Sequence, residues 1–386
     1  MQSEMPLDCF ENAGQIAVER ALSEFRAARP VAIVAQDSLA LAFPVEGLTG
    51  KQIEFLRAAG RNARLIIPGE KARSSAVWEE EAAAVRLNPL SLETIEAYST
   101  HLQGKANGAG FYRAVLIAAD PAETAALALA HGSLLLPAVM VADANAADLA
   151  RLPVLPVQAA DIAAFRDREA RSLKAIARTF VPLECGGQCE FVVFRGGDGF
   201  RDQVAVIVGE PSPDRPVLAR IHSACLTGDL FGSLKCDCGD QLRGTVKAMA
   251  AQGGGIVLYL DQEGRGNGIA NKIRAYCLQE EGFDTYDADE LLGFGQDQRR
   301  FDFAAEMLKQ LGFTSVRLMT NNPRKIAALR EAGLEVVSTH RVLARQTAYN
   351  ARYLAAKRDK GGHLLGDAAL DGIDLEDVLR PAIPQS

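Results

Sequence analysis

The sequence lacks the features that would mark a membrane protein or a general nucleic-acid binder. No apolar run reaches the roughly 18–20 residues that cross a bilayer, and the longest runs, at residues 134–141 and 255–260, have the length of strands. The net charge is −7, whereas affinity for a polyphosphate backbone comes from clustered Lys and Arg. We therefore expect neither a membrane nor a nucleic acid as a partner.

The sequence also predicts neither a secretory leader nor a disulfide framework. The first twelve residues, MQSEMPLDCFEN, have neither the basic start nor the apolar stretch of a signal peptide. The seven cysteines are an odd set, and the close pair Cys236 and Cys238 suits a disulfide poorly. The pattern favours a reducing cytoplasm, in which thiols are available to bind a metal.

The length of 386 residues exceeds the roughly 250–300 residues of a single core. In the first half helical and strand periods alternate, as in the helix expected at 12–28 and the strand at 31–35. Residues 156–182 carry charges of both signs at helical spacing, which predicts one long amphipathic helix that connects two domains.

Beyond this connector the composition changes, because most cysteines and glycine-rich turns follow it. Strands at 189–194 and 204–208 around a Gly-Gly-Asp-Gly turn predict a hairpin. We expect a mixed α/β (α+β) protein with domains at 1–180 and 181–386. The second domain would start as antiparallel β and continue as βα units around a zinc site.

Three cysteines, Cys225, Cys236 and Cys238, are spaced C-x10-C-x-C among Gly and Asp residues. Three thiolates can hold one Zn²⁺ and leave its fourth tetrahedral position to water, as catalytic sites do. The alternative is a closed structural zinc, for which His222 is the nearest fourth ligand. His222 lies three positions before Cys225, and on a strand this odd offset puts the two side chains on opposite faces, which weakens the alternative.

Two strand ends are suited to an anionic group. The strand at 255–260 leads into a glycine-rich turn, where backbone amides and Arg265 can approach an anion and Glu263 offers two acceptor oxygens to a guanine edge. Residues 320–325, TNNPRK, place polar side chains before a helix N-terminus, whose amides favour phosphate. Together with a metal, these two strand ends suggest a nucleotide substrate.

A third charged group, Asp297 and Arg299, lies between Phe294 and Phe301. Taken by itself it is interpreted most simply as a surface ion pair, worth about 0–1 kcal/mol.

In their order, these motifs resemble GTP cyclohydrolase II of riboflavin biosynthesis. They run from Arg220 to Val342 as RIHSACLTGD, SLKCDCGDQL, QEGRG, NKIRAY, LGF followed by D-x-R, and TNNPRK. The family opens the imidazole ring of GTP with a zinc-bound water, expels C8 as formate and removes pyrophosphate, which leaves a diaminopyrimidinone ribosylamino phosphate. The resemblance implies a cytoplasmic homodimer that takes GTP.

The resemblance also implies roles for individual residues. The matched positions are Cys225, Cys236 and Cys238 for zinc, Asp297 for the proton acceptor, Arg299 for a nucleophile toward the α-phosphorus, and Tyr276 beside the base. GTP contacts are implied at Arg220, Gln241, Glu263, Arg265, Thr285, Thr320 and Lys325. The triphosphate would bring Mg²⁺, which prefers hard oxygen ligands. Because a guanidinium stays protonated, charge stabilisation of the triphosphate is a competing role for Arg299.

Three positions depart from the family pattern. Ala224 replaces a glutamate, Asp261 stands where an arginine or similar residue precedes QEGR, and Asn267 replaces an aliphatic residue. A carboxylate near a triphosphate carries an electrostatic cost, so a paralogue acting on another purine or pyrimidine nucleotide, of the pyrimidine catabolism type, is an alternative. A catalytically silent nucleotide-binding scaffold is another, although a binding module needs no open metal position.

The first half resembles 3,4-dihydroxy-2-butanone 4-phosphate synthase in its opening helix and strand, residues 21–35, and in its exit, residues 152–169. That family binds Mg²⁺ through an acidic cluster after the strand. Here residues 36–41, QDSLAL, contain one carboxylate, that of Asp37. We therefore expect a degenerate, non-catalytic domain that serves in dimerisation or covers the second site.

Overall fold

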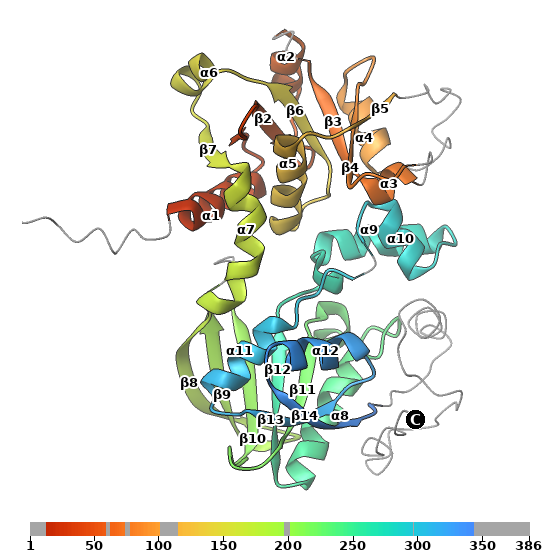
Figure 1. Ribbon diagram of the computed structural model, residues 1–386. Coiled ribbons are helices and arrows are strands. Elements are labelled where there is room, and N and C mark those ends of the chain that lie inside the picture. The colour runs from red at the N-terminus through yellow and green to blue at the C-terminus, as the bar shows by residue number, and fades with distance from the viewer. Residues whose placement is uncertain are drawn as a thin grey trace, which may run out of the picture. The chain divides into compact units, whose positions relative to one another are not determined.

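A computed structural model describes residues 13–58, 62–73, 78–100, 115–196, 201–295 and 297–342. The chain divides into two compact units, each built on a seven-stranded sheet with helices (Figure 1). Unit 1 comprises residues 1–167 and 287–295, and unit 2 comprises 168–286 and 296–386. The expected mixed α/β class is confirmed. Within the described ranges, no helix is both long and apolar enough to span a membrane.

Unit 1 contains a sheet in which one neighbouring pair of strands is parallel and the others are antiparallel. Its strands are β1 (Val31–Val34), β2 (Leu39–Pro44), β3 (Arg64–Pro68), β4 (Ala82–Val85), β5 (Leu116–Ala118), β6 (Val139–Asp143) and β7 (Leu155–Gln158). The strand order is β5-β4-β3-β6-β2-β1-β7, with β1 and β7 parallel. The helices of this part of the chain are α1 (Ala13–Arg26), α2 (Gly50–Ala58), α3 (Gly69–Arg73), α4 (Leu92–Thr100), α5 (Pro121–Gly132), α6 (Ala146–Arg151) and α7 (Ala159–Glu169).

The core of unit 1 forms where α1 and α5 pack on this sheet. Val18 and Phe25 of α1 are buried with Leu129 of α5 against strand residues such as Val31 and Val141. The start of α5 is stabilised locally, because the Asp120 side chain accepts from the amide of Glu123 while the Glu123 side chain accepts from the amide of Asp120. This capping box satisfies backbone donors that the helix itself leaves unpaired.

Unit 2 contains a sheet that is antiparallel in one half and parallel in the other. Its strands are β8 (Lys174–Leu183), β9 (Gly187–Arg195), β10 (Gln203–Gly209), β11 (Val217–Ser223), β12 (Gly254–Leu260), β13 (Ser315–Met319) and β14 (Glu335–His340), in the order β14-β13-β11-β12-β10-β9-β8. Strands β8, β9, β10 and β12 pair antiparallel, whereas β12, β11, β13 and β14 pair parallel. The longer helices are α8 (Cys238–Ala251), α9 (Ile269–Glu280), α10 (Thr285–Leu291), α11 (Asp302–Gln310) and α12 (Pro323–Glu331), of which α10 continues into unit 1.

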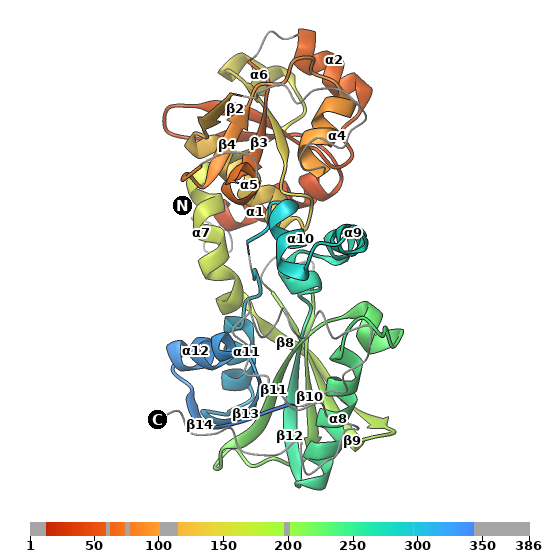
Figure 2. The same cartoon turned by 90° about the vertical axis from the view of Figure 1, so that its right-hand side faces the viewer.

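Helices cover both faces of the second sheet (Figure 2). Ile256 of β12 packs in one apolar cluster with Met307 of α11 and Leu329 of α12. The next residue, Val257, packs in another cluster with Met249 of α8. Successive strand residues point to opposite faces, so a continuous apolar strand such as β12 needs helices on both sides.

The single helix predicted over 156–182 is correct only for residues 159–169, which form α7, because 156–158 belong to β7 and the chain leaves the helix after 169. A 3₁₀ turn, η2 (Ala170–Ser172), follows α7, and the chain then forms β8, which pairs with β9 along its length. Most β8 side chains are exposed, including those of Ile176 and Phe180. An edge strand of this kind lacks the alternation of buried and exposed residues from which a strand is recognised in a sequence. Backbone pairing therefore decides its conformation.

The capping box of α5 gives a test of the fold of unit 1. We expect Asp120→Ala to lower the free energy of unfolding of this unit by about 1 kcal/mol, because the Glu123 amide at the start of α5 loses its acceptor. Urea unfolding followed by circular dichroism measures this change. Asp37→Ala, at an exposed position, is the matched control, and equal transition midpoints for the two variants would contradict the assignment of the cap.

Candidate active site

The candidate site lies at the carboxyl ends of the parallel strands β11, β12 and β13. Ser223 pairs with Leu260, so β11 and β12 end side by side. The loop after β11 contains the cysteines, the loop after β12 begins at Asp261 and contains Glu263, and Thr320 directly follows β13. Ligands of open α/β sheets bind at this edge.

Three thiols meet in the cysteine loop, residues 224–238. The sulfur atoms of Cys225, Cys236 and Cys238 lie within 4.8 Å of one another, and those of Cys225 and Cys236 are 3.6 Å apart. A Cβ atom on Gly228 would lie 2.6 Å from the Cys236 sulfur and 3.0 Å from that of Cys225. Only glycine fits there, and a donor set of three thiols suits zinc.

Lys272 of α9 supplies a positive charge to this cluster. Its Nζ lies 3.1 Å from the Cys225 sulfur, 2.9 Å from Thr227 Oγ1 and 2.9 Å from Glu263 Oε1. Hydrogen bonds from Cys236 and Cys238, together with this ammonium, hold the pKa of the Cys225 thiol far below its usual range. Burial opposes the charged form of Lys272, but Cys225 and Glu263 raise its pKa. The loop is therefore arranged around thiolate charge.

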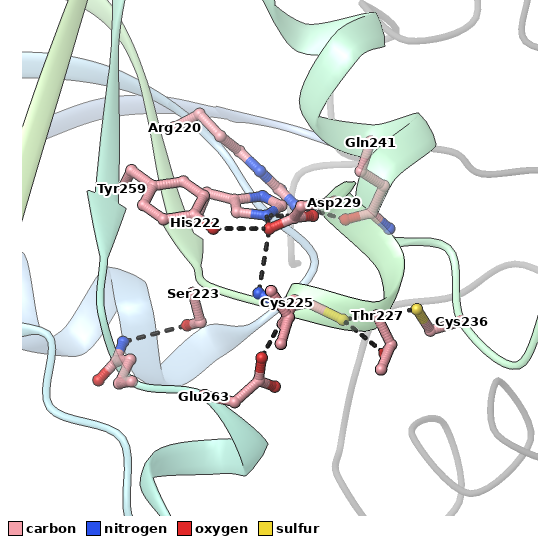
Figure 3. Close-up of polar contacts among 12 residues, drawn as sticks. Arg220, His222, Ser223, Cys225, Thr227, Asp229, Cys236, Gln241, Tyr259 and Glu263 are labelled. Atoms are coloured by element: carbon pink, nitrogen blue, oxygen red, sulfur yellow. Dashed lines mark hydrogen bonds and ion pairs between the residues drawn. The ribbon is translucent and has the colours of Figure 1, made fainter. Parts of the chain in front are cut away.

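A buried network fixes the cysteine loop to the sheet (Figure 3). The Asp229 carboxylate accepts from the Cys225 amide at 3.0 Å and from the Tyr259 hydroxyl at 3.0 Å, and both its oxygens lie 3.1 Å from His222 Nε2. The His222 ring stacks on Tyr259 with centroids 5.5 Å apart. Within the described residues, the group that could hold a metal consists of the three cysteines and does not include His222. This geometry disfavours the closed site with His222 as fourth ligand.

Glu263 joins the two strand ends. One of its carboxylate oxygens accepts from the Leu226 amide at 2.5 Å. The other accepts from the amide of the next residue, Gly264, and from the ammonium of Lys272. Arg265 has a left-handed backbone, and its guanidinium lies 3.9 Å from the Tyr286 ring centroid. Thr285 directly precedes Tyr286 at the start of α10. The structure thus brings Glu263 against the cysteine loop and Arg265 next to the Thr285 segment.

Buried cations lie beneath the same edge. Arg220 of β11 donates to the Met319 carbonyl at 3.0 Å and to the Gln241 side chain, and Lys325 donates to the Ile221 carbonyl at 2.8 Å. Burial lowers the pKa of Arg220 to about 10. Its Nε is buried and has no hydrogen-bond partner among the described residues. Thr320 is also buried, and its Oγ1 accepts from the amide of Asn322, which caps α12.

Asp297 and Arg299 form a largely buried pair and not the exposed one that the sequence suggested. Their side chains are 12% and 15% exposed. Arg299 donates from Nε and Nη2 to the two carboxylate oxygens at 2.8 and 2.7 Å, and Arg324 approaches at 3.0 Å. Burial alone would raise the pKa of Asp297, but these arginines lower it to about 2.

Some residues of the site could not be identified from the sequence, because their residue types do not indicate a role. Gln262 donates to Ser223 Oγ at 3.0 Å and accepts from the Arg300 amide at 2.9 Å, which ties the segment after Asp297 to the end of β11. Like Lys272 and Asp229, Gln262 lies inside one of the sequence motifs, but only its contacts in the structure show that it links these two segments. Tyr276 of α9 has Lys235 Nζ at 5.0 Å from its ring centroid, and burial raises its pKa.

The three residues that depart from the family pattern, Ala224, Asp261 and Asn267, have different surroundings. The Ala224 amide donates to the Leu260 carbonyl, and the Asp261 amide donates to Gln203 Oε1. Asn267 is 1% exposed, and neither polar atom of its side chain has a partner in the described part of the chain. Nothing in the structure explains this replacement.

Comparisons with known proteins agree with these motifs. The profile of the family described as GTP cyclohydrolase II matches residues 174–341. A GTP cyclohydrolase-2 of Azospirillum brasilense is 40% identical over 372 residues, which is 93% of this chain and 96% of that protein. One from Shewanella amazonensis is 45% identical over 198 residues, 51% of this chain and 95% of that protein. The riboflavin biosynthesis protein RibBA of Chlorobium phaeovibrioides is 40% identical over 205 residues, 53% of this chain and 50% of that protein.

The close approach at Gly228 yields a prediction for metal binding. Gly228→Ala places a methyl group against the sulfur atoms of Cys236 and Cys225 and the Cβ of Cys238, so we expect affinity for zinc to fall at least about tenfold. Competition with a chromogenic chelator measures this affinity. Gly50→Ala is the control, since a Cβ there meets no atom within 4 Å. An unchanged affinity in the Gly228 variant would remove the cluster as the metal site.

The Asp297 pair yields a prediction for acid stability. Its folded pKa of about 2 lies below the ordinary 3.8, so the pair stabilises the fold above pH 3.8 and loses this effect as the pH falls toward 2. Arg299→Met leaves only Arg324 to oppose the effect of burial on that pKa, and we expect a loss of stability on the order of 2 kcal/mol between pH 4 and 7. Acid unfolding, followed by circular dichroism, should therefore begin at higher pH.

The control for this variant is Arg243→Met, because Arg243 pairs with Asp240 at the exposed surface. If both variants unfolded at the same pH, the buried pair would contribute no more to acid stability than the exposed pair of Arg243 and Asp240.

Proposed function

Because the chain belongs to the GTP cyclohydrolase II family, we propose that it catalyses the zinc-dependent hydrolytic opening of the imidazole ring of GTP, with release of formate and pyrophosphate. This is the first step of riboflavin biosynthesis. The observation that supports it most is the cluster of three thiols at the strand edge that also holds buried Arg220 and Lys325. One edge thus offers a metal site and positive charge for a triphosphate.

Cys225, Cys236 and Cys238 would hold the zinc. The group of possible ligands in the described residues contains three donors, which leaves one tetrahedral position for water. When bound, zinc lowers the pKa of such a water to about 7 and so makes a hydroxide nucleophile available near neutral pH. Lys272, in contact with Cys225, would offset the charge of the three thiolates.

The triphosphate would lie over the buried cations. The unpartnered Nε of Arg220 and the ammonium of Lys325 are charged donors, and donors of this kind bind phosphate strongly in a partly desolvated site. Thr320 and Gln241 flank them, and Mg²⁺ would accompany the phosphate oxygens. The remaining proposed contacts with GTP are those of Glu263, Arg265 and Thr285, with Tyr276 beside the base.

Asp297 is proposed as the proton acceptor. While Arg299 holds both its oxygens, its low pKa makes it a weak base. A phosphate that draws Arg299 away would raise that pKa, so substrate binding itself would prepare the base. Arg299 then stabilises charge on the triphosphate, since a guanidinium does not lose its proton under these conditions.

The proposal includes the rest of the molecule. We assign residues 1–180 to a degenerate, non-catalytic domain and 181–386 to the catalytic domain, in a cytoplasmic homodimer. The single carboxylate of residues 36–41 supports the first assignment.

The direct test is to incubate the zinc-loaded protein with GTP and to measure formate and pyrophosphate separately. We expect both products in equal amounts. Formate without pyrophosphate would contradict the role of Arg299 at the triphosphate. Neither product from GTP, with turnover of another purine or pyrimidine nucleotide, would establish the divergent paralogue in place of this proposal.

A variant links the metal to the reaction. Cys236→Ser removes one of three ligands, so we expect zinc content and formation of both products to be lost together. Cys277→Ser, at an exposed free thiol, should leave both unchanged. Turnover that survived loss of zinc in the Cys236 variant would contradict a hydrolytic metal.

A further inference from the structure

Lys71 is a buried lysine far from the candidate active site in the sequence. It lies in α3 and is 4% exposed. Its Nζ donates to the Ser99 carbonyl at 2.7 Å and to the Leu291 carbonyl at 2.9 Å. Burial lowers its pKa to about 8. Lysine is seldom placed inside a protein unless a specific contact holds it there.

Both carbonyls belong to the ends of helices. Ser99 is the penultimate residue of α4, and Leu291 is the last residue of α10. The last carbonyls of a helix have no partner within it, and they lie at the negative end of its dipole. One ammonium therefore satisfies the ends of two helices that are almost two hundred residues apart.

The second helix end belongs to a segment that returns to unit 1 from the later part of the chain. Residues 287–295 are part of unit 1, whereas the residues on both sides of them are part of unit 2. Phe294 is 1% exposed, and its ring centroid lies 5.8 Å from that of His131. At Gly293, which has a φ of 89°, a Cβ would lie 3.1 Å from Pro68. Three contacts thus hold this segment within unit 1.

The flanks of the segment belong to the candidate active site. Thr285 lies two residues before it, and Asp297 lies two residues after Gly295. Two residues span at most about 7 Å, so the position of Gly295 limits where Asp297 and its partner Arg299 can be. This limit on the position of Asp297 follows from chain connectivity alone.

We propose that Lys71 is a positioning residue, which, by holding the C-terminus of α10 within unit 1, fixes the segment that leads into Asp297 and Arg299. This gives the first half of the chain a role in the reaction without chemistry of its own. The inference rests on the proposed function only for its effect on turnover, because the attachment of the segment can be measured without substrate.

The test is Lys71→Met, which keeps the apolar stem and removes the donor. Hydrogen–deuterium exchange of the amides of 288–295 should rise at least about tenfold, since local opening becomes easier. With GTP, kcat should fall at least about tenfold through misplacement of Asp297 and Arg299, while zinc content stays the same and KM changes less than kcat. Phe294→Leu, which loosens the segment from its other side, should act in the same direction.

Lys51→Met is the matched control, because Lys51 is an exposed lysine of α2. Unchanged exchange in Lys71→Met would overturn the attachment by Lys71, and faster exchange with unchanged kcat would overturn the positioning role. A fall in zinc content would also count against the proposal, since it would indicate general damage to unit 2. If the unaltered protein released no formate or pyrophosphate, the proposed function would fail, whereas exchange would still decide whether Lys71 holds the segment.

Discussion

The geometry of the site depends on the hydrogen bonds that the carboxylate of Asp229 accepts. It accepts hydrogen bonds from the Cys225 amide and the Tyr259 hydroxyl and lies against the ring of His222. These partners come from β11, from β12 and from the cysteine loop itself, so one buried acceptor fixes the loop to the sheet. Without it, three thiols on a glycine-containing loop would keep much of their conformational freedom, and a metal would have to order them at the cost of its own binding energy.

A second constraint is the balance of charge. Three thiolates around a bound metal would repel one another, and Lys272 lies where it would reduce that repulsion while it also holds Glu263 and Thr227. Asp297 is held by Arg299 and Arg324 in the same way. In both places a potentially reactive group is paired within the protein. In the proposed reaction, the pair at Asp297 would have to separate before its carboxylate could accept a proton, and substrate binding would thereby be coupled to catalysis.

The sequence was informative where chemistry is carried by local spacing. The C-x10-C-x-C pattern identified the three thiols, and the apolar run at 255–260 identified β12, because a strand covered on both faces is apolar throughout. Sequence reasoning failed for β8, whose exposed side chains give no period, and for Asp229, Gln262 and Lys272, whose roles arise from contacts across up to 47 positions. It also missed the return of residues 287–295 to unit 1. The assigned catalytic roles remain predictions.

In the proposed site, three thiols hold a zinc ion whose fourth position is open. X-ray absorption spectroscopy of the zinc-loaded protein tests it most directly. We predict three sulfur atoms at about 2.3 Å and one oxygen at about 2.0–2.2 Å, without the outer-shell scattering of an imidazole. A fourth sulfur, an imidazole shell or the absence of bound zinc would contradict it.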